Sequence, residues 1–206
     1  MKRMMAAVTA VLIVGAWVDV AAGQQRGTGT GTAAPRGRGA AAPAAAPAPQ
    51  RSPGAGPIIV FETANKGSFE METYPNEAPK TVAHILALVK RNFYNGQRIH
   101  RQVPGFVVQW GDPLSRDYTR RERWGTGGSG TAIGVGEVNA KRTHRVGAVA
   151  AAHAGDPRQA DSQIYVALAA QPRLDGDFTV FGQVIAGMDV VRKLEVGDVI
   201  RRATIK

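Results

Sequence analysis

Residues 57–206 are predicted to form a mostly β domain with two helices. Three observations point to this class: short β-branched and apolar runs recur along the segment, turn-forming residues separate them, and only two stretches have helical periodicity. A parallel sheet needs a helix at each crossover, so two helices are too few for one. The pattern favours a sandwich or a closed barrel.

The first two runs have the pattern of a hairpin. Ile58–Phe61 is apolar throughout, and Phe69–Tyr74 alternates apolar and acidic side chains, as a strand with one wet face should. Turn-forming residues lie between them at Asn65–Gly67. Further strands are expected in the later apolar runs, at Phe106–Gln109, Val146–Ala150, Gln163–Leu168, Thr179–Val184 and Val199–Ile205.

One helix is predicted to begin near Pro79, because proline suits a first helical turn, where its missing N–H costs nothing. The apolar residues that follow have the i, i+3, i+4, i+7 spacing of a single stripe, at Val82, Ile85, Leu86 and Val89. A second, shorter helix is expected at Met188–Leu194, after Gly187.

The first 56 residues are expected to lie outside this domain. Lys2 and Arg3 precede the apolar run Ala6–Val18, and small residues follow it, which is typical of a secretory signal peptide over residues 1–23. The run is shorter than the ~20 residues that cross a bilayer. We therefore expect export, to the periplasm or the medium, without stable membrane insertion. Residues 24–56 are Ala-, Pro- and Gly-rich without apolar periodicity, which predicts a disordered linker.

Composition argues against several function classes. The chain has no cysteine, so disulfides and cysteine-ligated zinc are excluded, and its four histidines lack the paired spacing of zinc helices. We expect no metal. The net charge is +10, but residues 57–206 carry only +5 of it, and we expect no nucleic-acid partner.

Two further segments resemble functional motifs, but their sequence context argues against those functions. Gly125–Gly130 satisfies the G-x-G-x-x-G pattern, but it neither follows a clear strand nor opens a helix, as a dinucleotide site would require. Ser162 lies in a segment with no nucleophile elbow, which argues against a serine hydrolase. No cofactor is expected.

Five segments of the chain, taken in order, match the successive motifs of one protein family: Asn76–Ala83, Phe93–Gly96, Ile99–Pro113, Ala160–Val166 and Leu174–Gly182. In this order they resemble the cyclophilins, and the match extends over nearly all of residues 58–205. Together with the signal peptide, the resemblance predicts an exported bacterial member of that family.

The resemblance implies an eight-stranded antiparallel closed β-barrel capped by two α-helices, with a shallow peptide groove on its outer face. It also implies a peptidyl-prolyl cis-trans isomerase, which accelerates X-Pro bond rotation in exported proteins and takes proline-containing polypeptides as partners. Rotation about an amide breaks no covalent bond, so neither a nucleophile nor a cofactor is needed. We expect a monomer.

Matching positions assign the site. Arg101 would be the catalytic cation, since its planar fork of donors can hold the substrate carbonyl and meet the imide nitrogen. Phe106 and Gln109 would act with it. The other positions that match substrate-binding residues of the family are Val107, Gly125, Ala152, His153, Gln163, Tyr165, Leu174 and Phe178.

The sequence also departs from the family pattern. Arg173 stands where cyclosporin-sensitive members carry tryptophan, His153 replaces a common asparagine, and the segment 114–124 is longer than the usual loop. An alternative function uses the same groove, as a non-catalytic chaperone or scaffold module that binds proline peptides. Proline isomerisation by an Arg101→Ala variant would distinguish the two.

Overall fold

Eight strands form a single sheet in the part of the chain that the structure, a computed structural model, describes: Ser52 and residues 54–206. The predicted signal peptide and most of the predicted linker lie outside these residues. The strands are β1 (Ile58–Thr63), β2 (Ser68–Thr73), β3 (Arg101–Val103), β4 (Val107–Trp110), β5 (Ala148–Ala151), β6 (Ile164–Ala167), β7 (Val180–Ala186) and β8 (Ile200–Ile205).

Every pairing in the sheet is antiparallel, in the order β3-β4-β6-β5-β7-β2-β1-β8. The predicted hairpin and the five later strands are therefore confirmed to within a few residues, and β3 was not predicted. The mostly β class with two helices is also confirmed, with α1 at Pro79–Lys90 and α2 at Met188–Lys193. Neither of these described helices is long and apolar enough to span a bilayer.

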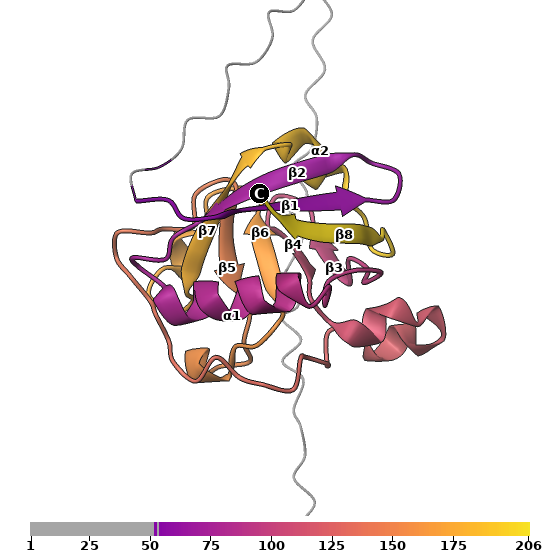
Figure 1. Ribbon diagram of the computed structural model, residues 1–206, viewed down its shortest axis with the longest axis horizontal. Coiled ribbons are helices and arrows are strands. Elements are labelled where there is room, and N and C mark those ends of the chain that lie inside the picture. Colours follow the sequence, from indigo (N-terminus) through magenta and orange to yellow (C-terminus); the bar gives the residue numbers. More distant parts are fainter. Residues whose placement is uncertain (1–51, 53) are drawn as a thin grey trace, which may run out of the picture. The chain divides into compact units, whose positions relative to one another are not determined.

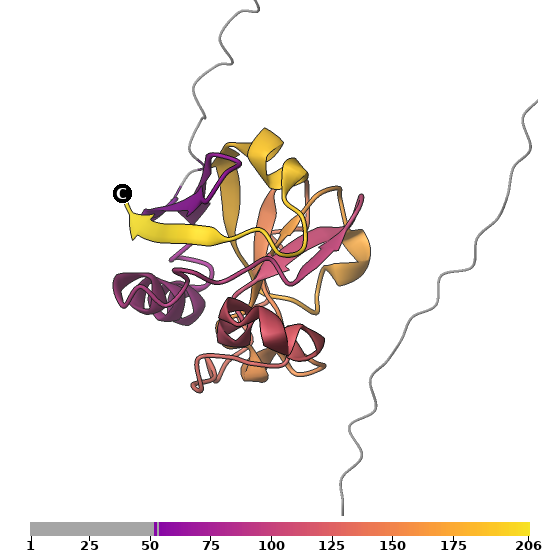
Figure 2. The same cartoon turned by 90° about the vertical axis from the view of Figure 1, so that its right-hand side faces the viewer.

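The predicted closure of the barrel is wrong, since the sheet curls into an open half-barrel (Figures 1 and 2). Its edge strands, β3 and β8, form no ladder in the described residues. The loops before them meet instead, through the single bridge between Arg98 and Val199 and a bond from the Ile99 N–H to the Asp198 carbonyl, 2.9 Å. With only three residues, β3 is too short to continue that contact into a strand pair.

Helix α1 lies beneath β1 and β8 in Figure 1 and covers one side of the core. Its buried residues include Val82, Ile85 and Val89, as predicted, but Leu88 is buried where Leu86 was expected and Leu86 is only partly covered. No side chain at the start of the helix caps it. The Glu137 carboxylate does so from a distant loop, accepting bonds from the Lys80 and Thr81 N–H groups at 2.9 and 2.8 Å.

The central strands β4, β6, β5 and β7 are buried on both faces. Their inward residues join an aromatic core in which Phe61 packs against Phe69 and Trp110 with ring centroids 5.2 Å apart in each case. Alternate residues face outward and form a second apolar cluster: Val107, Ala148, Ala150, Tyr165, Ala167 and Val180. Apolar side chains on an outer sheet face give a surface on which a ligand can bind.

An arm of two 3₁₀ helices, η1 (Pro113–Arg116) and η2 (Tyr118–Arg123), projects from the sheet at the right of Figure 1. The buried carboxylate of Asp112 holds both ends of this arm. One oxygen accepts from the Leu114 N–H at 2.7 Å, and the other accepts from the N–H groups of Gly125 and Gly127 at 2.6 and 3.1 Å. The long segment found in the sequence is thus an ordered insertion on a fixed base.

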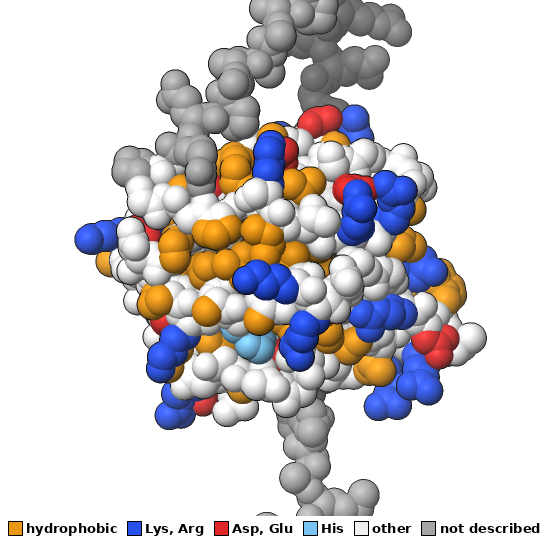
Figure 3. All heavy atoms as spheres, in the orientation of Figure 1, with side chains coloured by type: hydrophobic (Ala, Val, Ile, Leu, Met, Phe, Trp, Pro, Cys, Tyr) orange, Lys and Arg blue, Asp and Glu red, His pale blue; other side chains and the backbone are white. Residues whose placement is uncertain are grey.

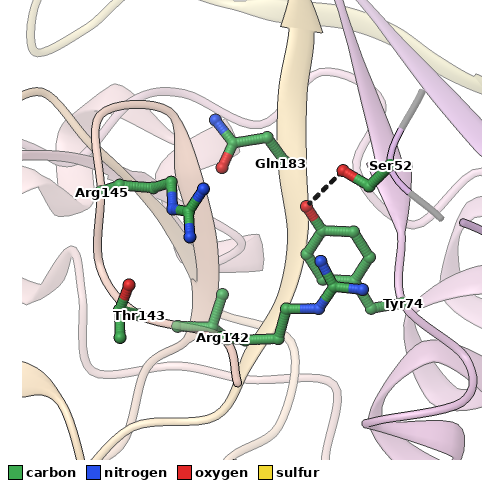
Figure 4. Close-up of a pocket in the computed structure, with 7 residues that line it drawn as sticks. Ser52, Tyr74, Arg142, Thr143, Arg145 and Gln183 are labelled. Carbon is green, nitrogen blue, oxygen red and sulfur yellow. Dashed lines mark hydrogen bonds between the residues drawn. The ribbon is translucent and has the colours of Figure 1, made fainter. Parts of the chain in front are cut away.

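The folded contacts begin within the segment that the sequence assigned to the linker. The Ser52 N–H donates to both oxygens of the buried Glu72 carboxylate, at 3.1 and 3.0 Å, and its hydroxyl lies 3.3 Å from that of Tyr74. Ser52 and Tyr74 line a cavity of about 230 Å³. The Arg142 guanidinium also lines it and lies 3.6 Å from the centre of the Tyr74 ring (Figure 4). Ser52 is therefore part of the packed domain.

Gly111 and Gly130 offer a matched test of close packing after β4. Both have positive φ, +110° and +88°, but an added Cβ at Gly111 would lie 2.2 Å from the Ser162 carbonyl oxygen, whereas nothing lies within 4 Å at Gly130. We expect Gly130→Ala to cost about 1–2 kcal/mol of unfolding free energy from backbone strain, and Gly111→Ala about 1–3 kcal/mol more from overpacking. Equal losses in thermal unfolding would contradict this account.

The imidazole of His100 should make the stability of the folded domain depend on pH. Burial lowers the pKa of its imidazole from 6.5 to about 4, so between these values the unfolded chain binds a proton that the folded chain does not. Stability should fall as the pH is lowered from about 6.5 to 4, by on the order of 3 kcal/mol from this group. In urea titrations, the unfolding free energy of His100→Phe should change less between pH 7 and pH 4.5 than that of the wild type. Equal changes for the variant and the wild type would refute this role of His100.

Candidate active site

The predicted site residues meet on the outer face of the sheet in two adjoining cavities. A cavity of about 120 Å³ is lined by nine of them: Arg101, Phe106, Val107, Gln109, Ala152, His153, Tyr165, Leu174 and Phe178. The other two, Gly125 and Gln163, line a neighbouring cavity of about 380 Å³, which shares Gln109, Ala152 and His153 with the first. The structure thus brings together residues up to 77 positions apart in the sequence.

The smaller cavity has an apolar floor and aromatic walls. Tyr165 and Phe178 pack edge to face, with ring centroids 5.8 Å apart. The His153 ring stacks on Phe178 at 4.3 Å, and its Nε2 lies 3.0 Å from the Asp177 carbonyl. His153, which stands where the family commonly has asparagine, thus forms a wall of the cavity with its ring. Such a pocket suits a compact apolar ring.

Arg101 lies on β3 directly opposite Gln109 on β4. Its Nη1 is 3.5 Å from the Gln109 Oε1, and its guanidinium lies 5.5 Å from the centre of the Phe106 ring. The side chain is exposed and forms no ion pair with a carboxylate in the described part of the chain. N–H groups of the planar Arg101 guanidinium therefore remain available to donate hydrogen bonds to a ligand above the cavity.

A relay of side-chain amides orients Gln109. Its Nε2 donates to the Gln163 Oε1 at 2.9 Å, and the Gln163 Nε2 donates to the carbonyls of Gly125 and Gly127 at 2.8 Å each. The Gly125–Gly127 loop is in turn held by Asp112 through its N–H groups. The relay turns the Gln109 oxygen toward Arg101, which fixes the polar edge of the cavity before any ligand arrives.

The glycine-rich loop has no free cradle for phosphate. Asp112 accepts from the Gly125 and Gly127 N–H groups, and Asp161 accepts from the Gly130 N–H at 3.0 Å. An added Cβ at Gly127 would lie 2.4 Å from Asp112, and one at Gly128 2.5 Å from Asp161. Close approach of two carboxylates explains these glycines, and the same negative charges would repel phosphate.

Sequence reasoning missed a polar chain beneath the cavity. The buried His144 places Nδ1 2.7 Å from the Asp175 carboxylate and Nε2 3.0 Å from the Tyr165 hydroxyl. Burial acts to raise the pKa of Asp175, yet bonds from the His144 backbone and ring hold it below its ordinary value. Burial also raises the pKa of Tyr165 well above its usual range, so its hydroxyl stays protonated. The sequence offered no signal for this chain, because His144 lies 31 residues from Asp175 and 21 residues from Tyr165.

The arrangement combines an apolar cavity, one exposed cation and an oriented amide. In the described residues, no group of three or more His, Cys, Asp or Glu side chains is placed to hold a metal ion. On the side of the molecule drawn in Figure 3, Lys and Arg side chains lie in several separate places, with hydrophobic side chains between them. The site is built to hold a small apolar ring beside a carbonyl group.

Comparisons with known proteins agree with this geometry. Residues 58–206 match the family model described as cyclophilin type peptidyl-prolyl cis-trans isomerase/CLD. Peptidyl-prolyl cis-trans isomerase B of Bacillus subtilis (strain 168) is 37% identical over 148 residues, which cover 72% of this chain and 96% of that protein. A peptidyl-prolyl cis-trans isomerase of Helicobacter pylori is 36% identical over 138 residues, covering 66% and 79%.

Solved structures show the same fold. A crystal structure of a cyclophilin type isomerase from Cryptosporidium parvum matches with a TM-score of 0.64 at 23% identity, covering 73% of this chain and 97% of that one. The same protein in the presence of the dipeptide Ala-Pro matches with a TM-score of 0.63. Given the family match over residues 58–206 and relatives more than 30% identical, this chain belongs to the cyclophilin-type peptidyl-prolyl cis-trans isomerases.

Proposed function

We propose that Arg101, Phe106 and Gln109 carry the isomerase activity, and that the other eight predicted site residues, which line the two cavities, bind the substrate peptide. The observation that supports this most is the guanidinium of Arg101, which has no ion-pair partner among the described residues and lies beside an apolar cavity of about 120 Å³. A proline ring fits that cavity on Phe106, Val107 and Tyr165, with its imide bond at the rim.

The energetic demand on such a site is small. Uncatalysed X-Pro exchange takes about 10–100 s, so turnover at about 1–10³ s⁻¹ needs only about 1–7 kcal/mol of transition-state stabilisation. As the C–N bond twists, conjugation is lost and the imide nitrogen regains a lone pair that can accept a hydrogen bond. Arg101 donates to that nitrogen, and the bond exists only in the twisted state, which is what lowers the barrier.

We further propose that the substrates are proline-containing polypeptides and that the domain acts as a monomer. The similar structure solved in the presence of Ala-Pro supports the choice of substrate. The signal-peptide pattern of residues 1–23 supports export from a bacterial cell to the periplasm or the medium, where the chain would act on exported proteins.

Replacing Arg101 tests the catalytic role. Arg101→Ala should lower kcat/KM for an Ala-Pro peptide by about 10²-fold or more, the usual cost of a lost transition-state donor. Arg101→Lys keeps the charge without the planar fork and should lose about tenfold. Melting temperatures should stay close to the wild type, because the side chain is exposed. Arg120→Ala, on the projecting arm, is the control for loss of one surface arginine. Full activity of Arg101→Ala would show that the role is misassigned.

Export is tested by expressing the full chain in a bacterial host. Mass spectrometry of the periplasmic and culture fractions should find a product that begins near residue 24. Leu12→Arg places a charge in the apolar run and should trap the unprocessed chain in the cytoplasm. An unprocessed wild-type chain in the cytoplasm would contradict export.

A further inference from the structure

We propose that Arg173 makes this enzyme prefer substrates with a carboxylate side chain on the residue that flanks the proline. This inference rests on the proposed placement of the proline ring in the cavity at Phe106.

Arg173 lies at the rim of the proline cavity. It belongs to the short 3₁₀ helix η4 (Pro172–Leu174), and the next residue, Leu174, lines the cavity itself. The Arg173 guanidinium lies 4.7 Å from the centre of the Phe106 ring. The side chain is exposed, so its charged end is open to a ligand from the solvent side.

The backbone on both sides of Arg173 is fixed. Gln171 donates from its N–H to the His144 carbonyl at 2.7 Å and from its Nε2 to the Gly105 carbonyl at 3.0 Å. Asp175 binds the buried His144 on the other side. Gly105 directly precedes Phe106, so these bonds tie η4 to the aromatic ring that Arg173 covers. The backbone that carries the Arg173 guanidinium is thus held in place by hydrogen bonds on both sides.

Two unpaired cations surround this one ring. Arg101 and Arg173 both lie over Phe106, and neither forms an ion pair with a carboxylate of the described residues. The nearby Asp175 is already engaged with His144. Two like charges held close together repel each other, and a ligand carboxylate between or beside them would relieve that repulsion. Arginine also binds carboxylates through two parallel hydrogen bonds.

The size of the cavity directs the flanking side chain to this rim. At about 120 Å³ it equals roughly four water molecules, so a proline ring fills it and its neighbours must lie outside. The neighbouring cavity at Gln163, of about 380 Å³, has room for the chain on one side of a proline placed in this way. The residue on the other side of the proline would then pass the edge of Phe106, where Arg173 lies.

The test compares kcat/KM for peptides that carry Glu, Gln or Lys directly before the proline, and a second series with the same residues directly after it. In one of the two series, the variable residue lies on the side of the proline away from Gln163. In that series we expect kcat/KM of the wild type to be about three- to fivefold higher for the Glu peptide than for the Gln peptide, which is the size of effect that an exposed ion pair gives. Lys should be slower than Gln. The preference should shrink in 0.5 M salt, because exposed charges are screened.

Variants separate charge from packing. Arg173→Met keeps an apolar side chain on Phe106 and should bring the Glu-to-Gln ratio close to one, whereas Arg173→Lys should retain most of it. Arg173→Glu should reverse the order to favour Lys. Arg120→Met, which removes a distant surface charge, should keep the wild-type ratio. Ratios are compared within each folded variant, so a general loss of rate does not affect the readout.

Two failures are distinguishable. If the wild type isomerises every peptide at the same rate in both series, or Arg173→Met keeps the Glu preference, the inference about Arg173 is wrong and the proposed catalytic site stands. If Arg101→Ala matches the wild type on all the peptides, the proposed site itself is wrong.

Discussion

Burial on both faces of the central strands is the constraint on which the site depends. In β4, β6, β5 and β7, one set of alternate residues completes the aromatic core and the other set lines the outer groove. A shift of one residue in register would exchange the two sets. The core around Trp110 and Phe61 therefore fixes Val107, Gln109 and Tyr165 on the outer face, and the packing that stabilises the domain also positions its chemistry.

Local pattern predicted much of the fold, and non-local contacts account for the errors. The alternation in Phe69–Tyr74 and the stripe along α1 are properties of neighbouring residues, so both elements could be found from the sequence. Strand β3 is three residues long with its ends exposed, and so short a segment has no periodicity to detect. Closure of the barrel depended on how the two edge strands meet, which no local pattern encodes.

The site was predictable only where family resemblance supplied the positions. Resemblance named Arg101 and Gln109, and the structure then placed them opposite each other on paired strands. It did not reveal the chain from Asp175 through His144 to Tyr165, whose members are 31 and 21 residues apart in sequence. Nor did it show that Arg173 and Arg101 share one aromatic ring, because that depends on how η4 is held against Gly105.

The carboxylate of Asp112 has a consequence for evolution. One buried side chain fixes both the start of the arm at Leu114 and its return at Gly125 and Gly127. The base of the arm is also tied to the domain through Ser115 and Arg116, but residues 119–123 at its tip are not buried, so their number and sequence can vary without moving the groove. The cost of closing a loop rises only slowly with its length. Mutation can therefore remodel this surface independently of catalysis, and a foreign peptide could be grafted there on the same terms.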